Sequence, residues 1–158
     1  MDMKRTAAGV VVVMVAFGTT EAAAAPPTEP EREVLEFLDI SRLVTGPEGP
    51  PDPGDAFVFA NILRLPDRSD AVTRQWFGRF PSTCTVVQGM QAECEGTLEL
   101  PDGTITVEGT PDLAVSPIDM VVTGGTGRYA TVTGSAQLTG TDRAGTSRLS
   151  VVLDRPVS

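Results

Sequence analysis

The chain has 158 residues, a formal net charge of −9 and no histidine. This length is sufficient for one domain with a buried core. The negative charge argues against nucleic acid or an anionic membrane as the main partner. The lack of histidine excludes the commonest general base and metal ligand, together with every Ser–His or Cys–His nucleophile pair.

The N-terminus has the three parts of a secretory signal peptide. Lys4 and Arg5 give it a positive start, and an apolar run of 12 residues follows from Ala7 to Gly18. Such a run is too short to span a bilayer comfortably. Small residues come next, at Ala22–Ala25. We therefore predict a signal peptide over residues 1–24 and a secreted protein without a stable membrane span after processing.

A proline-rich stretch comes next and predicts a flexible leader over residues 25–32. The remaining residues, 33–158, are expected to form one domain. The alternative is a cytoplasmic protein that keeps its N-terminal segment, which would then serve as a membrane anchor or as a lid over a pocket.

The domain is predicted to be all-β, because helix-favouring stretches are scarce while Gly and Pro, at 16 and 13 residues, are plentiful. The candidate strands are 33–40, 54–64, 72–80, 82–88, 91–100, 104–110, 117–123, 128–140 and 146–154. Only Pro81 separates 72–80 from 82–88, so one bent strand is the alternative there. Successive hairpins of this kind indicate an eight-stranded antiparallel up-and-down barrel, with a β-sandwich as the alternative.

The two cysteines stand in CTVVQGMQAEC, which is nearly symmetric about Gly89. A hairpin centred there places Cys84 opposite Cys94, close enough for a disulfide after a small adjustment. An oxidising compartment favours that bridge. Two buried thiols are the alternative, and a catalytic thiol would have no histidine to activate it.

The glycine-rich run TGGTG, from Thr123 to Gly127, is similar to the turn of a dinucleotide-binding fold. Such a turn should open a helix within a βαβ unit. The residues that follow instead alternate small or apolar side chains with polar ones, mostly hydroxyls, from Ala130 to Thr139, which is the period of a strand. We therefore expect the glycines to link two antiparallel strands.

Four segments in this order, GDAFVFANIL, CTVVQ, LPDGTITVEG and VVTGGTGRYATVTGSAQL, resemble the allene oxide cyclase-like barrel family, which is related to plant dirigent proteins. The resemblance covers about residues 33–155. It implies an eight-stranded barrel with a mostly apolar cavity, no cofactor, and a homodimer or homotrimer. It also implies hydrophobic substrates, and some actinobacterial relatives form spirotetronate rings by [4+2] cycloaddition.

The resemblance carries over two polar residues. Glu36 falls on the functional glutamate of the plant cyclases, and Asn61 falls on an asparagine that helps to hold a bound water. A second water-holding asparagine would fall on Leu38. Asn61 also shares a strand face with apolar residues, so its buried amide needs a partner in the fold or a ligand. Glu36 could instead be a surface carboxylate, and Asn61 could bond to a neighbouring strand.

The cavity wall is expected to consist of aromatic side chains and a methionine. Its candidates are Phe57, Phe59, Trp76, Phe77 and Met120, although Phe57, Phe59 and Met120 also suit an ordinary core, and only one of Trp76 and Phe77 should face inward. The hypotheses are a cofactor-free cyclase or isomerase of a hydrophobic polyene or polyketide, and a secreted, non-catalytic barrel that binds a lipophilic molecule or a partner. No metal site is expected.

Overall fold

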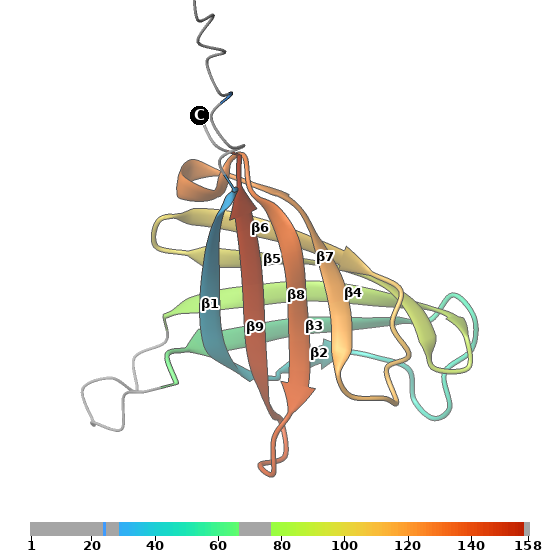
Figure 1. The fold of residues 1–158 in the computed structure, drawn as a ribbon. Coiled ribbons are helices and arrows are strands. Elements are labelled where there is room, and N and C mark those ends of the chain that lie inside the picture. Colours follow the sequence, from blue (N-terminus) through green and yellow to red (C-terminus); the bar gives the residue numbers. More distant parts are fainter. Residues whose placement is uncertain (1–23, 25–28, 67–76, 157–158) are drawn as a thin grey trace, which may run out of the picture.

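The computed structural model describes residues 24, 29–66 and 77–156, which form nine β-strands and one short 3-10 helix (Figure 1). The strands are β1 (Glu31–Ile40), β2 (Leu43–Thr45), β3 (Ala56–Arg64), β4 (Gly78–Gln88), β5 (Gln91–Leu100), β6 (Gly103–Gly109), β7 (Ile118–Gly125), β8 (Thr133–Gly140) and β9 (Thr146–Arg155). The helix η2 (Gly127–Tyr129) precedes β8.

The strands close into an antiparallel barrel. Hydrogen-bonded neighbours follow the order β1-β9-β8-β7-β6-β5-β4-β3-β2, and β1 also pairs with β3. This last pairing places Leu38 opposite Arg64 and joins the two ends of the sheet, so that β2 remains as an extra strand beside β3. The predicted all-β, eight-stranded up-and-down barrel is therefore confirmed, and the sandwich alternative is wrong.

β4 continues through Pro81 as a single strand, which was one of the two possibilities left open, and its register with β5 is the same at Arg79–Glu99 and at Ser82–Gly96. Two other segments differ from the strands expected from sequence. β2 was not expected. η2 begins in the segment between β7 and β8 where a strand was expected, and β8 begins only at Thr133.

The glycine-rich run ends β7 and leads into η2. Gly127, the last glycine of the run, has a φ of +58°, and a Cβ there would overlap the carbonyl oxygen of Asp102. Only glycine allows both this backbone conformation and this close approach. The run therefore belongs to the link between the antiparallel strands β7 and β8, as expected, and does not begin a nucleotide-binding helix.

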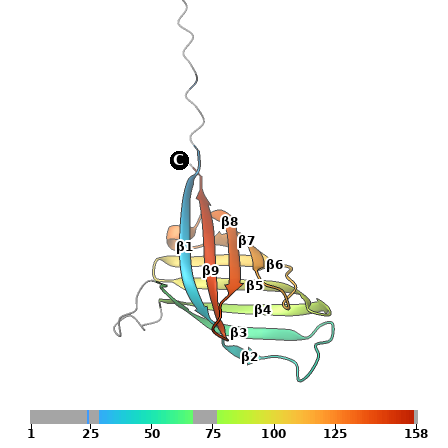
Figure 2. The ribbon, with the colours of Figure 1, turned by 60° about the horizontal axis from the view of Figure 1, so that its bottom comes forward.

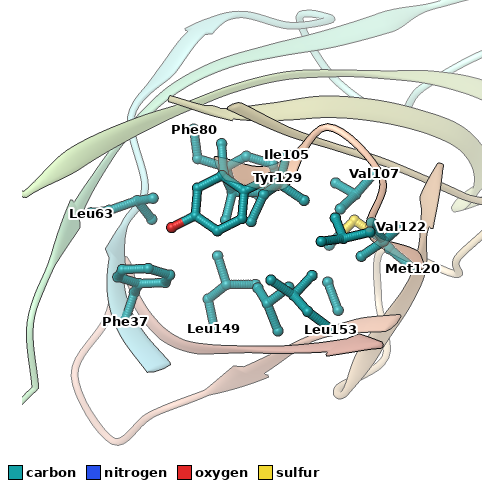
Figure 3. Packing of buried hydrophobic residues seen from close by; sticks show 14 residues of the cluster. Phe37, Leu63, Phe80, Ile105, Val107, Met120, Val122, Tyr129, Leu149 and Leu153 are labelled. Atoms are coloured by element: carbon teal, nitrogen blue, oxygen red, sulfur yellow. The ribbon is translucent and has the colours of Figure 1, made fainter. Parts of the chain in front are cut away.

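The barrel interior is densely filled near η2. Tyr129 is buried there, and its ring lies among Phe80, Ile105 and Leu149, with the hydroxyl pointing towards Leu63 (Figure 3). Burial raises the pKa of the Tyr129 hydroxyl, so this group stays protonated at neutral pH. The hydrophobic core therefore fills the end of the barrel near η2, and a ligand site would lie at the opposite end.

An ion-pair cluster covers the filled end of the barrel. Glu33 continues the inward row of β1 and accepts from Arg128 Nη2 at 2.6 Å and from Arg155 Nη2 at 2.8 Å. Arg155 Nη1 also donates to the carbonyl oxygen of Arg128 at 2.9 Å. These contacts connect the start of β1, η2 and the end of β9.

We expect Glu33→Gln to lower the free energy of unfolding by about 1 kcal/mol, because it removes the charge that two guanidinium groups share. Urea unfolding checks this value, and the difference should shrink in 1 M salt, where screening weakens ion pairs. Glu31→Gln, an exposed change on the same strand, is the control. Equal shifts in both variants would contradict the prediction.

Within the described ranges, no helix has the length and apolar character needed to cross a membrane.

Candidate active site in the barrel cavity

The barrel encloses a cavity of about 360 Å³ at the end away from η2, a volume within the range of small-molecule sites. Its wall includes Asp39 near the end of β1, Leu43 of β2, Leu138 of β8 and Ser147 of β9. These residues lie towards the β8–β9 hairpin, at the bottom of Figure 1, and Figure 2 brings this end forward. Most of the wall is apolar: Leu43, Phe57, Phe59, Phe80, Met90, Leu113, Ile118, Met120 and Leu138.

Two buried polar side chains meet in this apolar wall. Asp39 is 1% exposed and Asn61 is 5% exposed. The β1–β3 pairing that closes the barrel brings them together, because Asp39 lies opposite Leu63, two residues from Asn61. Asn61 Nδ2 donates to Asp39 Oδ2 at 2.8 Å, and Asn61 Oδ1 accepts from the backbone N–H of Arg42 at 3.0 Å. The amide is thus fixed in orientation and holds the carboxyl in place.

The second oxygen of Asp39 has no hydrogen-bond partner among the described residues. Burial raises the pKa of Asp39 to about 7, and the hydrogen bond from Asn61 opposes this rise without cancelling it. The carboxyl can therefore exchange a proton near neutral pH. A buried carboxyl with a shifted pKa in a cavity is a typical sign of a functional group.

Glu36 lies outside the cavity, which corrects the expectation that it reaches the site. Inward positions on β1 are Leu35, Phe37 and Asp39, so Glu36 projects to the outer face. Its side chain is 50% exposed, and Glu36 Oε2 lies 3.7 Å from Arg148 Nη1. The structure therefore does not bring Glu36 and Asn61 together.

The expected wall residues divide into three groups. Phe57, Phe59 and Met120 line the cavity, and the rings of Phe57 and Phe59 are 6.4 Å apart. Phe77 is partly exposed outside the cavity wall and stacks on Phe37 at 5.8 Å. Trp76 lies outside the described residues.

The predicted bridge between Cys84 and Cys94 is present, with an S–S distance of 2.02 Å. The two cysteines are direct partners on β4 and β5, as the symmetry of the hairpin sequence predicts. They form part of the cavity wall and pack against Phe57, Phe59 and Leu113. The disulfide thus supports the aromatic side of the cavity.

A second hollow, of about 640 Å³, lies on the outer face of β4–β7. Threonines and exposed glutamates line it, among them Thr83, Thr85, Glu93 and Glu108. Water screens charges on such a face, and none of its lining residues is a buried polar group with an unpartnered atom. We therefore place the candidate site in the inner cavity.

No family model and no curated protein sequence matches the chain. Several solved structures do match. A pyocyanin demethylase is 21% identical with a TM-score of 0.65, over 77% of this chain and 99% of its own. The pterocarpan synthase dirigent protein GePTS1 is 18% identical with a TM-score of 0.59, over 87% and 99%. The Diels-Alderase AbmU from Streptomyces koyangensis is 20% identical with a TM-score of 0.64, over 82% and 71%.

The chain has the allene oxide cyclase-like barrel fold. Identities of about 20% show shared fold alone, so these matches confirm the resemblance inferred from sequence at that level. Proteins with this fold include a Diels-Alderase and a dirigent protein, as their names state.

Asp39 is a candidate site residue that sequence reasoning missed in this allene oxide cyclase-like barrel. The signal that singled out Asn61, one polar residue in an apolar row, was also present on β1, where Asp39 follows Leu35 and Phe37 at spacings of two. The alignment to a family motif gave Glu36 the inward position instead. Placing the row of Leu35, Phe37 and Asp39 on the inward face of this strand would have identified Asp39.

Proposed function

We propose that this barrel is a cofactor-free cyclase that holds a hydrophobic polyene or polyketide-type molecule in its cavity and promotes ring closure by [4+2] cycloaddition. The observation that carries the proposal is the buried Asp39 carboxyl, whose Oδ1 has no partner among the described residues while Asn61 holds Oδ2. The likeness to solved cyclase structures supports the fold that this chemistry needs.

The cavity contributes to such a reaction in two ways. In a cycloaddition, two C–C bonds form between a diene and a dienophile within one folded molecule, and nothing leaves. The apolar wall holds the substrate in its reactive shape, so that the entropy cost of ordering the substrate is met on binding and not in the transition state. Protonated Asp39 donates a hydrogen bond to the carbonyl oxygen of the dienophile, which gains negative charge in the transition state. The proton stays on Asp39 throughout.

Ring closure of 1,7,9-decatrien-3-one tests this proposal, because the molecule is small, apolar and carries one carbonyl on its dienophile. We expect wild-type protein to accelerate closure, and Asp39→Leu to lower the accelerated rate by about 100-fold, which is the typical value of one aimed donor. The acceleration should be present below pH 7 and fall above it, as Asp39 loses its proton. Asp39→Asn keeps an N–H donor and should lose this pH dependence.

Glu36→Gln is the matched control, because it neutralises an exposed carboxylate on the same strand. Its rate should equal that of wild type. Circular dichroism and urea unfolding identify any variant that fails to fold. Equal rates for wild type, Asp39→Leu and buffer would sink the catalytic proposal, and a selective loss in Glu36→Gln would favour the assignment made from sequence.

A second candidate function is a secreted, non-catalytic barrel that binds a lipophilic molecule. The disulfide favours it, because such bonds persist in oxidising compartments, and the expected signal peptide favours it as well. The intact mass of the protein in lysate and culture supernatant tests the export on which this candidate depends. A supernatant species that begins at Ala25 supports export, and a lysate species that retains residues 1–24 contradicts it.

A further inference from the structure

The charges around the cavity have one sign. Among the described residues that line it, Asp39 and Glu95 are acidic, and none is Lys or Arg. The chain as a whole carries a formal net charge of −9. An electrostatic field of this sign attracts cations and repels anions at the cavity.

We propose that the cavity selects lipophilic cations, such as an aromatic or alkyl ammonium, and rejects carboxylates of the same shape. This inference rests on the proposed function only in using the same cavity as a ligand site. The ammonium group would donate to the unpartnered Oδ1 of Asp39, since charged hydrogen bonds of this kind are stronger than neutral ones. Asn61 keeps the carboxylate in place through Oδ2.

The aromatic rings favour the same class of ligand. Phe57, Phe59 and Phe80 line the cavity together with Asp39. The face of an aromatic ring attracts a cation, and this attraction grows where water is excluded. The apolar body of the ligand would pack on Met120 and Leu138 on the opposite strands. A carboxylate ligand in the same place would face the carboxyl of Asp39 and, among the described lining residues, no basic side chain.

Binding of a cation should depend on the protonation of Asp39. The neighbours across β3 and β9 are neutral, since Asp39 lies opposite Leu63 and Ser147 and bonds to Asn61. The nearby charged side chains lie elsewhere. Arg64 and Arg148 alternate to the outer faces of β3 and β9, and Glu36 is beside Arg148. Arg42 contributes its backbone N–H, and Glu95 is exposed. Asp39 is thus the buried titrating group of the cavity wall, since Glu95, the other acid there, is exposed, and cations need the ionised form of Asp39.

Calorimetric titration of the full chain with three probes of one shape tests the inference: 1-naphthylmethylamine, 1-naphthylmethanol and 1-naphthoic acid. At pH 8 we expect the amine to bind at least tenfold more tightly than the alcohol, and the acid at least tenfold more weakly. Because Asp39 ionises near pH 7, amine affinity should fall about 30-fold by pH 5.5 while alcohol affinity stays constant. Asp39→Asn should bring amine and alcohol within threefold of each other.

Glu93→Gln is the control, because it removes one exposed negative charge from the outer face of β5. It should retain the wild-type order of affinities. Binding of the alcohol without preference for the amine would overturn the inference and leave the cavity as a ligand site for the proposed cyclase. Binding of none of the three probes would overturn both. Retention of the amine preference in Asp39→Asn would show that Asp39 is not the recognising group.

Discussion

Asp39→Asn is expected to gain about 3–4 kcal/mol of unfolding free energy relative to wild type as the pH rises from 4 to 8. The carboxyl of Asp39 is almost fully buried, and burial raises its pKa from 3.8 to about 7. Above pH 7 the native wild-type protein therefore contains an ionised group inside an apolar wall. The asparagine side chain has a similar shape and no charge to bury.

The direction follows from proton binding in the two states. Between pH 3.8 and about 7 the native state holds a proton on Asp39 that the unfolded chain releases. Stability therefore decreases as the pH rises through this window, by about 1.4 kcal/mol for each unit by which the two pKa values differ. The stabilising contribution of the protonated carboxyl is complete below pH 3.8 and lost above pH 7. The Asp39→Asn variant would have no such dependence at this position.

Urea unfolding of both proteins at pH 4, 5, 6, 7 and 8 measures this difference directly. Other acids titrate equally in both proteins, so subtracting one curve from the other isolates Asp39. Glu93→Gln, an exposed change on the outer face, should run parallel to wild type. Parallel curves for Asp39→Asn and wild type would mean that the native carboxyl has an ordinary pKa, and the site would lose its neutral-pH proton donor.

A destabilising carboxyl in this position is informative about function. Nothing in the fold requires a charge there, since Asn61 already bonds to the backbone of Arg42 and could be satisfied by an uncharged partner. Residues that reduce stability without serving the fold are found mainly at functional sites. The stability gain in Asp39→Asn and the loss of the pH dependence of its activity should therefore appear together in one variant.

The barrel was accessible from sequence because most of its strands alternate clearly. On β5, Ala92, Cys94 and Leu98 are buried while Glu93 and Glu95 are exposed, so the interior face could be assigned without a structure. The hairpin symmetry likewise gave the disulfide. Asn61 was found because it interrupts an apolar row on β3.

The site itself was less accessible because β1 carries apolar residues on both faces. Val34 and Leu38 alternate with Leu35 and Phe37, so the segment gives no local sign of which row faces inward. The answer depends on the pairing of Asp39 with Leu63, which lies in another strand. Such a long-range register cannot be read from periodicity within a single strand.

Replacing both bridged cysteines by alanine is expected to lower the free energy of unfolding by about 2–3 kcal/mol. The bridge closes a loop of sequence separation 10, and a crosslink of this length removes roughly that much conformational freedom from the unfolded chain. Urea unfolding of Cys84→Ala/Cys94→Ala measures the change. Wild-type protein unfolded in excess reductant should match the variant, because it loses the same crosslink.

The same variant should also bind 1-naphthylmethanol more weakly, by about threefold to tenfold. Phe57, Phe59 and Leu113 pack against the disulfide, and its loss removes apolar wall that a ligand would cover. Ser82→Ala, a change in the cavity wall that leaves the bridge intact, is the comparison. If the double variant loses stability but binds the alcohol as wild type does, then the disulfide supports the β4–β5 hairpin alone. A ligand would then contact the cavity further towards Asp39.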